Sequence, residues 1–403
     1  MAFSAAELDF LLADCAAGSP LINDATTYQL TKKSLVQDLS HLRKAHGDNA
    51  RALVELVQAR RAGKLPESWL MDSESVQQAT PPVVAAWRAE VLKAAGVEAA
   101  VDVTCSIGTE LYALSAAGLR VLGGDLDHQR LRMARFNVPE APVVRMDALR
   151  PAFAGDLKSG VVVADPARRN SSGRIAKLED LQPPLPELLD CYDKMVVKCA
   201  PGIDYSEFDG HVEVVSVDGG VKETCLYSPA ILGRGRRAVV MGASSVKETV
   251  TSDEPETDRV GGVGRYIVDP DGAIVRAGLV RQYAARHGLW QLDPHIAYLT
   301  GDELPAGVRG FEVVEEVPLK KARSALVGLG AKSVEILVRG VDVDPDELRK
   351  KWKLKKGNAG GNGGASGAGA ADTAYSVVVT RIGEGGAAKA VAFICRARRS
   401  SRG

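Results

Sequence analysis

The spacing of hydrophobic residues changes near residue 82 and divides the chain into two kinds of pattern. Before this point apolar residues recur at helical spacing, for example over residues 34–63, with charged residues on the opposite face. After it, short apolar runs alternate with helical patterns: residues 99–108 predict a buried strand, and residues 109–118 predict a helix closed by glycine. Strands that alternate with helices are typical of a parallel, doubly wound sheet. The pattern therefore predicts an α/β fold.

Four regions are expected from these patterns. Residues 1–81 form an N-terminal helical segment, and residues 82–243 form the sheet domain, whose last two strands have no helix between them and predict an antiparallel edge. Residues 244–300 begin with an acidic, polar stretch and hold one clear helix, which predicts a linker with a connecting helix. Residues 301–403 form a separate α+β domain, interrupted by a flexible Gly-rich loop at residues 357–372.

Composition narrows the class of protein. The 403 residues include 51 Lys and Arg and 51 Asp and Glu, so a binding site for a polyanion requires local clustering of cations. No apolar run approaches the roughly 20 residues of a membrane span, and the acids near the N-terminus argue against a signal peptide. The six cysteines form no CxxC pair and have no histidine at ligand spacing. We therefore expect free thiols, no metal site and a cytoplasmic protein.

The turn after the first predicted strand has the features of an adenosine site. Such a site needs a turn of small residues and an acid at the end of the second strand, here Asp125. The turn keeps Gly108, but Ser106 stands where the first glycine is usual, and Glu110 lies at the start of the helix. An acid at a helix N-terminus would repel a pyrophosphate. The turn therefore favours a cofactor with a positive centre and no phosphate.

The segment VDVTCSIGTE resembles the first motif of class I S-adenosylmethionine-dependent methyltransferases. Four acids, Asp102, Asp125, Asp147 and Asp165, follow successive predicted strands at spacings of 23, 22 and 18 residues, one strand-helix repeat each. The resemblance implies a Rossmann-like, doubly wound sheet of seven strands that binds S-adenosylmethionine. It places Asp102 and Gly108 at the methionine end, Asp125 at the ribose and Asp147 at the adenine. The remaining predicted cofactor residues are Thr104, Cys105, Ser106, Thr109, Leu126 and Ala148.

Ser106 departs from this motif. The substitution implies either that the turn position has a negative φ or that the hydroxyl makes a cap-like hydrogen bond at the helix start. A capping serine leaves cofactor binding intact. The alternative is that the cofactor is held more weakly.

The segment DPARR, residues 165–169, resembles the fourth motif of amino-methylating enzymes, (D/N)PP(Y/F/W). In that family the acid and the proline carbonyl accept hydrogen bonds from the target amino group, and the aromatic ring stacks on a flipped base. The chain keeps Asp165 and Pro166 and has Arg168 in the aromatic position, where a guanidinium can stack or bind phosphate. These three are the predicted catalytic residues. Alternatively, Arg168 and Arg169 are a solvated pair at a strand end, or they form salt bridges with the acids of the segment LEDL.

Cys199, after the fifth strand of the predicted sheet, has two interpretations. Some cytosine and uracil methylases use a cysteine nucleophile, but here the Pro-Cys context is missing. A core thiol is the favoured interpretation.

The whole chain resembles an actinobacterial family of class I methyltransferases with a DPARR motif and a C-terminal THUMP-like domain. THUMP domains elsewhere bind structured RNA, commonly the acceptor end of tRNA. From Arg339 onward there are 13 Lys and Arg against 6 Asp and Glu, and one cluster surrounds Trp352, which suits phosphate contacts and base stacking. A solvated helix face with a basic tail is the alternative. The predicted RNA-binding residues are Arg169, Arg349, Lys350, Lys351, Lys353, Lys355 and Lys356.

The sequence therefore predicts an S-adenosylmethionine-dependent methyltransferase that acts on a nucleotide of tRNA or rRNA. Two alternatives stay open: a methyltransferase for proteins or small molecules, and a non-catalytic RNA-binding protein on the same fold. The RNA, the methylated atom and the oligomeric state are not determined by the sequence.

Overall fold

The computed structural model describes residues 3–150, 160–167, 169–170, 173–174, 176–356, 373–383 and 388–400. The expected Gly-rich loop at residues 357–372 lies outside them. The chain folds into two compact units. The first comprises Met1–Val215, Lys222–Gly235 and Gly242–Ser245, and the second comprises Ser216–Val221, Arg236–Met241 and Val246–Gly403.

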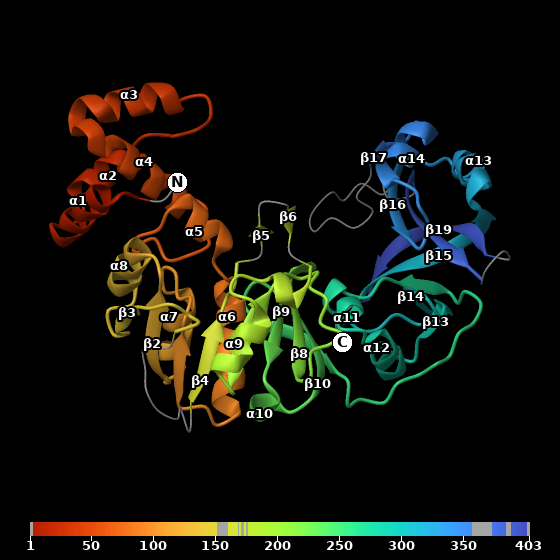
Figure 1. Cartoon of the computed structure of the whole chain (residues 1–403). Coiled ribbons are helices and arrows are strands. Elements are labelled where there is room, and N and C mark those ends of the chain that lie inside the picture. Colours follow the sequence, from red (N-terminus) through yellow and green to blue (C-terminus); the bar gives the residue numbers. More distant parts are fainter. Residues whose placement is uncertain are drawn as a thin grey trace. The chain divides into compact units, whose positions relative to one another are not determined.

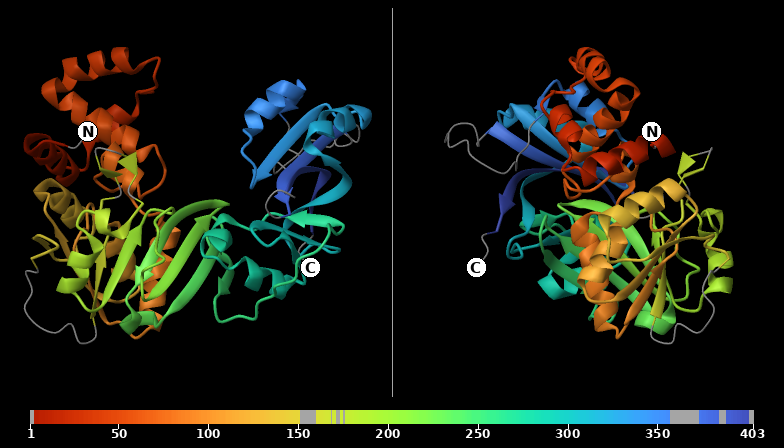
Figure 2. Two further views of the ribbon diagram at one scale, coloured as in Figure 1. Left: turned by 45° about the vertical axis from the view of Figure 1, so that its right-hand side comes forward. Right: turned by 90° about the vertical axis from the view of Figure 1, so that its left-hand side faces the viewer.

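The first unit begins with the expected N-terminal helices. Ser4 starts the first of them with a capping box to Glu7, and Asp72 caps the last of them through the backbone of Ser75. Their buried leucines share one hydrophobic core with Ile107 and with helix α8, beside which they lie in Figures 1 and 2. The helices are α1 (Ala5–Ala16), α2 (Pro20–Thr26), α3 (Leu35–His46), the 3-10 helix η1 (Gly47–Asn49), α4 (Ala50–Arg60) and α5 (Ser73–Gln78).

The same unit contains the predicted doubly wound sheet, with the strand order β3-β2-β1-β4-β7-β9-β8. In the full order β10 (Gly235–Met241) and β11 (Val246–Thr251) follow β8, so the sheet has nine strands among the described residues where seven were predicted. Parallel ladders join β3, β2, β1, β4 and β7, while β9 runs antiparallel to β7. The elements are α6 (Pro82–Ala94), β1 (Ala99–Asp102), α7 (Thr109–Ala116), β2 (Arg120–Asp125), α8 (His128–Asn137), β3 (Val143–Arg145), β4 (Gly160–Ala164), β5 (Arg169–Asn170), β6 (Gly173–Arg174), η2 (Leu178–Asp180), α9 (Leu185–Cys191), β7 (Met195–Cys199), β8 (His211–Val217), β9 (Gly220–Tyr227) and α10 (Pro229–Leu232). The Rossmann-like fold is thus confirmed.

Strand β9 was not expected from the sequence, and it changes the antiparallel part of the sheet. The predicted final pair was β8 with a strand near residues 236–244, and β8 does lie next to β10 (Gly235–Met241) in the strand order. The structure adds β9, which lies between β7 and β8. The reason is that Glu223 and Thr224 are buried in β9 beside the apolar Cys225 and Leu226, so the strand lacks the usual apolar pattern.

The second unit is built on a sheet with the order β13-β14-β12-β15-β19-β18-β16-β17. In one of its cores Leu326, Val334 and Trp352 pack together, and in a second core Ile267, Tyr298 and Phe393 do so. Its elements are β10 (Gly235–Met241), β11 (Val246–Thr251), β12 (Tyr266–Val268), α11 (Gly272–Arg276), α12 (Val280–His287), β13 (Trp290–Asp293), β14 (Ile296–Gly301), β15 (Arg309–Pro318), η3 (Leu319–Lys321), α13 (Ala322–Gly328), β16 (Ser333–Arg339), α14 (Pro345–Trp352), β17 (Lys355–Lys356), β18 (Ala374–Ile382) and β19 (Lys389–Arg399).

Residues 244–300 differ from the expected linker. They carry strands β11 to β14, and Tyr266 of β12 pairs both with Gly301 of β14 and with Glu312 of β15. Ile267 of β12 packs in one core with Phe311 and Phe393. The acidic stretch at the start of the region contains β11, which is why this strand was not predicted. The burial of the short strands after it depends on partners distant in sequence.

Membrane-spanning helices and metal-binding clusters were sought among the described residues alone. In that part of the chain no helix is long and apolar enough to cross a bilayer. The same residues contain no cluster of three or more His, Cys, Asp and Glu side chains able to hold a metal ion. None of the six cysteines, which all lie within the described residues, is in a disulfide, and four of them, Cys105, Cys199, Cys225 and Cys395, are buried.

Candidate active site

The carboxyl ends of β1, β2, β4 and β7 border one cavity of about 600 Å³ in the first unit. Ligands of doubly wound sheets bind at this edge, and the volume suits a small-molecule cofactor. The lining brings together residues that lie far apart in the sequence. They are Ser75, Gln77, Gln78, Ala79, Thr80, Asp102, Thr104, Cys105, Ser106, Ile107, Thr109, Glu110, Asp125, Arg130, Asp165, Pro166, Ala167, Gln182 and Lys198.

The turn after β1 adopts a left-handed conformation at Ser106, with φ of +49°. This corrects both sequence-based explanations, since φ is positive and the hydroxyl accepts from Arg130 Nη1 at 2.8 Å instead of capping α7. A non-glycine residue in this region costs about 1–2 kcal/mol. Two hydrogen bonds offset the cost: the one from Arg130, and one from the Ser106 backbone N–H to Asp125 Oδ2 at 2.9 Å. Ser106 is therefore part of a fixed turn.

Gly108 is required two residues later for both conformation and space. Its φ is +95°, and a Cβ built there would lie 3.0 Å from Val138 Cγ2. Helix α7 starts directly after it, which positions Thr109 and Glu110 at the cavity.

The carboxylate of Asp125 is held from two sides. Oδ2 accepts from Ser106 N, and Oδ1 accepts from Asp127 N, each at 2.9 Å. Asp127 itself caps α8 through the backbone N–H groups of Gln129 and Arg130. The two backbone donors therefore fix the orientation of the Asp125 side chain in the cavity.

Asp102, the last residue of β1, is 3% exposed and accepts from Thr104 N at 3.0 Å. Burial raises its pKa to about 7, even though the Lys198 ammonium opposes this rise. The charges of Glu110 and Asp165 raise its pKa further. A cationic group bound in the cavity would stabilise the ionised form of Asp102.

A chain of buried ion pairs continues from the cavity into the core. Asp165 Oδ2 lies 2.8 Å from Lys198 Nζ, which lies 3.2 Å from Glu110 Oε1. Arg88 Nε lies 3.2 Å from Glu110 Oε2, and Arg88 Nη1 lies 2.7 Å from Glu223 Oε1. Although burial raises the pKa of Glu110, the charges of Arg88 and Lys198 outweigh it and bring this pKa to about 2.

This network changes the interpretation of Glu110. The sequence argument treated its carboxylate as a free negative charge that would repel a pyrophosphate. In the structure two cations compensate that charge, so Glu110 by itself carries little weight in choosing the cofactor.

Not every predicted cofactor residue borders the cavity. The described lining lacks Gly108, Leu126, Asp147 and Ala148. Leu126 is 62% exposed, and Asp147 accepts a hydrogen bond from Leu149 N within its own turn. Whether a residue lines the cavity depends on where its strand ends relative to the neighbouring strands. The spacing of acids along the sequence does not specify this.

The predicted basic residues fall into different groups. Arg168 lies outside the described residues, and Arg169 belongs to strand β5. Lys350, Lys351 and Lys353 are exposed at the end of α14, whereas Arg349 is paired with Asp346. The backbones of Lys355 and Lys356 form β17.

Trp352 is not available for base stacking. It is 5% exposed and packs in the core of the second unit with Leu326 and Leu348. The amphipathic spacing of α14 places the tryptophan on the core side of the helix and the lysines on the solvent side. The predicted stacking role of Trp352 is therefore wrong.

Sequence reasoning missed several residues of the cavity, among them Arg130 and Gln182, and two further contributors matter for its chemistry. One is the segment of α5 and the residues after it, where the Thr80 side chain is buried and its hydroxyl has no hydrogen-bond partner within the described residues. The other is Lys198, the one charged residue in the buried strand MVVKC. A cation inside an otherwise apolar strand is a signal that the sequence did contain.

Cys199 does not line the cavity and is completely buried, with Sγ 4.0 Å from Val197 O. Successive residues of a strand point to opposite faces, so the exposure of Lys198 to the cavity turns Cys199 away. The core-thiol interpretation agrees with this geometry.

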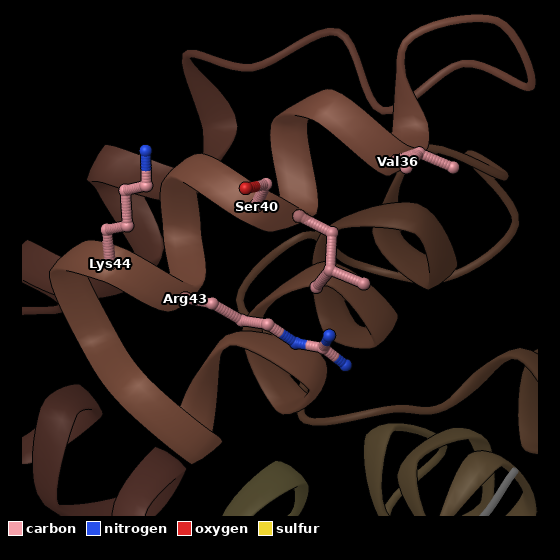
Figure 3. A pocket seen from close by; sticks show the side chains of 5 residues that line it. Val36, Ser40, Arg43 and Lys44 are labelled. Atoms are coloured by element: carbon pink, nitrogen blue, oxygen red, sulfur yellow. The ribbon is translucent and has the colours of Figure 1, made fainter.

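A second hollow, of about 420 Å³, lies on α3 and is lined by Val36, Leu39, Ser40, Arg43 and Lys44. Figure 3 shows these side chains projecting from one helix. It has no acid that could meet a positive cofactor, and none of the predicted site residues lines it. The cavity at the strand ends is therefore the candidate active site.

Comparison with known proteins agrees with the fold. A family model described as THUMP domain-like matches residues 308–397. An uncharacterized S-adenosylmethionine-dependent methyltransferase of Mycobacterium tuberculosis is 45% identical over 383 residues, which cover 89% of this chain and 100% of the relative. The crystal structure of a putative methyltransferase from Porphyromonas gingivalis W83 shares the fold, with a TM-score of 0.67 and 20% identity over 98% of this chain and 99% of that chain.

The doubly wound sheet, the cavity at its carboxyl edge and these relatives define a methyltransferase that uses S-adenosylmethionine. The chain belongs to the family of S-adenosylmethionine-dependent methyltransferases that the mycobacterial protein represents. It carries a THUMP-like domain at residues 308–397.

Proposed function

We propose that this enzyme methylates a nucleotide of structured RNA, a tRNA or an rRNA, in the cavity at Asp165. The observation that carries the RNA assignment is the THUMP-like domain together with the exposed lysines of α14, Lys350, Lys351 and Lys353. Three cations on one solvent-facing helix end suit contacts to phosphate. A protein or small-molecule substrate would leave these lysines without a role in catalysis.

The residues of the cavity fit S-adenosylmethionine. Asp102 offers a buried carboxylate to the positively charged methionine end, and Asp125 offers a fixed acceptor to the ribose hydroxyls. The buried Thr80 hydroxyl supplies a further polar group that has no partner in the described part of the protein. Thr104, Cys105, Ser106 and Thr109 complete this half of the cavity, as the first motif predicts.

Asp165 and Pro166 are proposed to take part in methyl transfer at the other end of the cavity. The bound cofactor supplies a methyl group on a positively charged sulfonium. Asp165 accepts a hydrogen bond from the target group and thereby directs the lone pair of its attacking atom toward the methyl carbon. The buried Pro166 shapes the same wall, and Arg168 is proposed to contact the substrate as the motif predicts. No covalent nucleophile is needed.

Cofactor affinity is expected to rise with pH through neutrality because the Asp102 pKa is about 7 in the cofactor-free protein. The positive methionine end binds the ionised carboxylate, so binding displaces a proton below this pKa. Affinity at pH 6 should be roughly tenfold weaker than at pH 8, as expected for one titrating group. Isothermal titration calorimetry at pH 6, 7 and 8 measures this.

The matched control for this pH dependence is Asp102→Asn. It removes the titrating carboxyl, so its affinity should be weak and should retain only the pH dependence that comes from the cofactor's own amine. Equal wild-type affinity at pH 6 and pH 8 would show that Asp102 does not meet a positive group.

The RNA assignment is tested with the triple variant Lys350→Gln/Lys351→Gln/Lys353→Gln. The lysines are expected to bind phosphates, so their replacement should weaken tRNA binding and reduce the slope of log K against log salt by about one unit for each lysine that binds a phosphate. Filter binding at several salt concentrations gives both values.

The control Lys32→Gln/Lys33→Gln/Lys44→Gln removes the same charge from exposed positions of the first unit. It should leave the salt slope near that of the wild type. An equal loss of affinity in both variants would indicate non-specific attraction, and absence of wild-type binding at low salt would refute the RNA substrate.

A further inference from the structure

Lys198 occupies an unusual position for a lysine. It lies in β7, the middle strand of the sheet order, and its side chain is 5% exposed. Its ammonium lies 2.8 Å from Asp165 Oδ2 and 3.2 Å from Glu110 Oε1. Burial lowers the pKa of Lys198, but the charges of Asp165 and Glu110 outweigh this and raise it above its ordinary value. Lys198 therefore stays charged throughout the accessible pH range.

Stability does not explain why this lysine is present. Removing two ions from water costs several kcal/mol each, and well-packed apolar residues in place of a buried ion pair are often neutral or stabilising. Both neighbours of Lys198 in β7, Val197 and Cys199, are buried and apolar. An apolar residue would therefore be favoured at position 198 unless the lysine charge has a function in the cavity that Lys198 borders.

The contacts of Asp165 show what the charge does. Lys198 holds Oδ2 from the side of the core, and the backbone N–H of Asp165 donates to Thr104 Oγ1 at 2.7 Å. Thr104 in turn donates from its backbone to Asp102. The Asp165 side chain is 26% exposed, so its carboxylate faces the cavity while its orientation is held from behind.

Lys198 is itself held in place by the deeper pairs. Glu110 bridges it to Arg88, and Arg88 contacts Glu223 of β9. These residues come from α6, α7, β7 and β9, which are rigid elements of one core. The ammonium therefore has little freedom to follow a movement of Asp165.

We propose that Lys198 is a positioning residue that holds the Asp165 carboxylate ionised and in one orientation, as a fixed hydrogen-bond acceptor for the target group. This inference rests on the proposed function of Asp165. It implies that Asp165 does not serve as a proton acceptor with a pKa near neutrality. It also restricts the target to a group that donates a hydrogen bond, because an ionised carboxylate only accepts.

The test compares Lys198→Met with Lys198→Arg, which keeps the charge, and with Lys177→Met, which removes an exposed lysine outside the cavity. The first readout requires no substrate: the ¹³C signal of the Asp165 carboxyl is followed against pH in cofactor-free protein, assigned by its loss in Asp165→Asn. We expect Lys198→Met to move the titration midpoint upward by at least about one pH unit, since an opposite charge at this distance favours the ionised acid. Lys198→Arg should keep most of the wild-type midpoint.

The second readout is methyl transfer to RNA as a function of pH. In Lys198→Met, kcat at pH 7 should fall about 100-fold, as expected for loss of one preorganised group, while KM for RNA changes less than about threefold. The pH dependence of kcat in Lys198→Met should follow the shifted midpoint of its own Asp165 carboxyl, and Lys198→Arg should restore much of the lost rate. A loss of kcat that is equal at all pH values, with an unmoved Asp165 titration, would overturn the proposal and leave Lys198 a structural residue.

Lys198→Met leaves Glu110 with one cation fewer and is liable to disturb folding. The double variant Lys198→Met/Glu110→Gln removes one charge of each sign, and circular dichroism checks its fold. It should still show an upward shift of the Asp165 midpoint, smaller than in Lys198→Met because a neighbouring negative charge is also removed. A midpoint at or below that of Glu110→Gln alone, in a folded double variant, overturns the proposal. If no RNA is methylated by the wild type, the proposed function fails, while the carboxyl titration still decides the role of Lys198.

Discussion

Asp165→Ala is expected to abolish methyl transfer while leaving cofactor binding nearly unchanged. The carboxylate lies at the catalytic end of the cavity, beside Pro166, and is held by Lys198. Loss of a preorganised group that interacts with the reacting centre lowers kcat by about 100- to 1000-fold. Single-turnover transfer of a labelled methyl group measures the rate, and calorimetry measures S-adenosylmethionine affinity, which should change less than about threefold because the variant removes no group assigned to the cofactor.

Two variants control this experiment. Asp190→Ala removes an exposed acid outside the cavity and should retain the wild-type rate. Asp165→Asn keeps the shape of the side chain but not its charge, and should give a rate between those of the wild type and Asp165→Ala. Full activity in Asp165→Ala would show that the catalytic motif has been placed at the wrong residues.

Asp125→Ala is expected to remove measurable cofactor binding. The carboxylate is proposed to accept from the ribose hydroxyls, and hydrogen bonds to a charged group contribute about 1.5–3 kcal/mol each. The same change releases the N–H of Ser106, whose left-handed turn depends on Asp125 Oδ2. The two effects together predict an affinity at least about 100-fold lower, because each 1.4 kcal/mol is a factor of ten. Calorimetry at pH 8, where Asp102 is ionised, is the appropriate measurement.

The matched control for this variant is Asp127→Ala in the same loop. Asp127 caps α8 but does not line the cavity, so its loss should cost about 0.5–2 kcal/mol of stability without a large effect on affinity. Comparable affinity in Asp125→Ala and wild type would mean that the ribose is bound elsewhere.

The fold was predictable because its main signals are local. Buried strands such as Gly160–Ala164 and Met195–Cys199 are short apolar runs, and helices of period 3.6 separate them. Strand β9 was missed because its buried Glu223 and Thr224 break such a run. The short strands of residues 244–300 were missed for a related reason, since their hydrophobic partners lie in β15 and β19.

The candidate site was partly predictable for the same reason. Asp102 and Asp125 end neighbouring parallel strands, and the carboxyl ends of such strands meet at one edge of the sheet. Asp147 follows the same sequence rule but does not line the cavity, because its side chain accepts a hydrogen bond within its own turn. An acid after a predicted strand therefore indicates the edge of the sheet at which it lies, but not the direction in which its side chain points.

What the sequence by itself determined is the class of fold, the motif turn at Ser106 and Gly108, and the acids at the strand ends. Only the tertiary structure decided the positive φ of Ser106, the burial of Trp352, and the contribution of Thr80 to the cavity wall. It also joined Asp165 to Lys198 and, through Glu110, to Arg88. The physical reason is the distance along the sequence over which each interaction acts. Periodicity and turn chemistry depend on a few neighbouring residues, whereas a buried ion pair forms only after the strand order has brought its partners together.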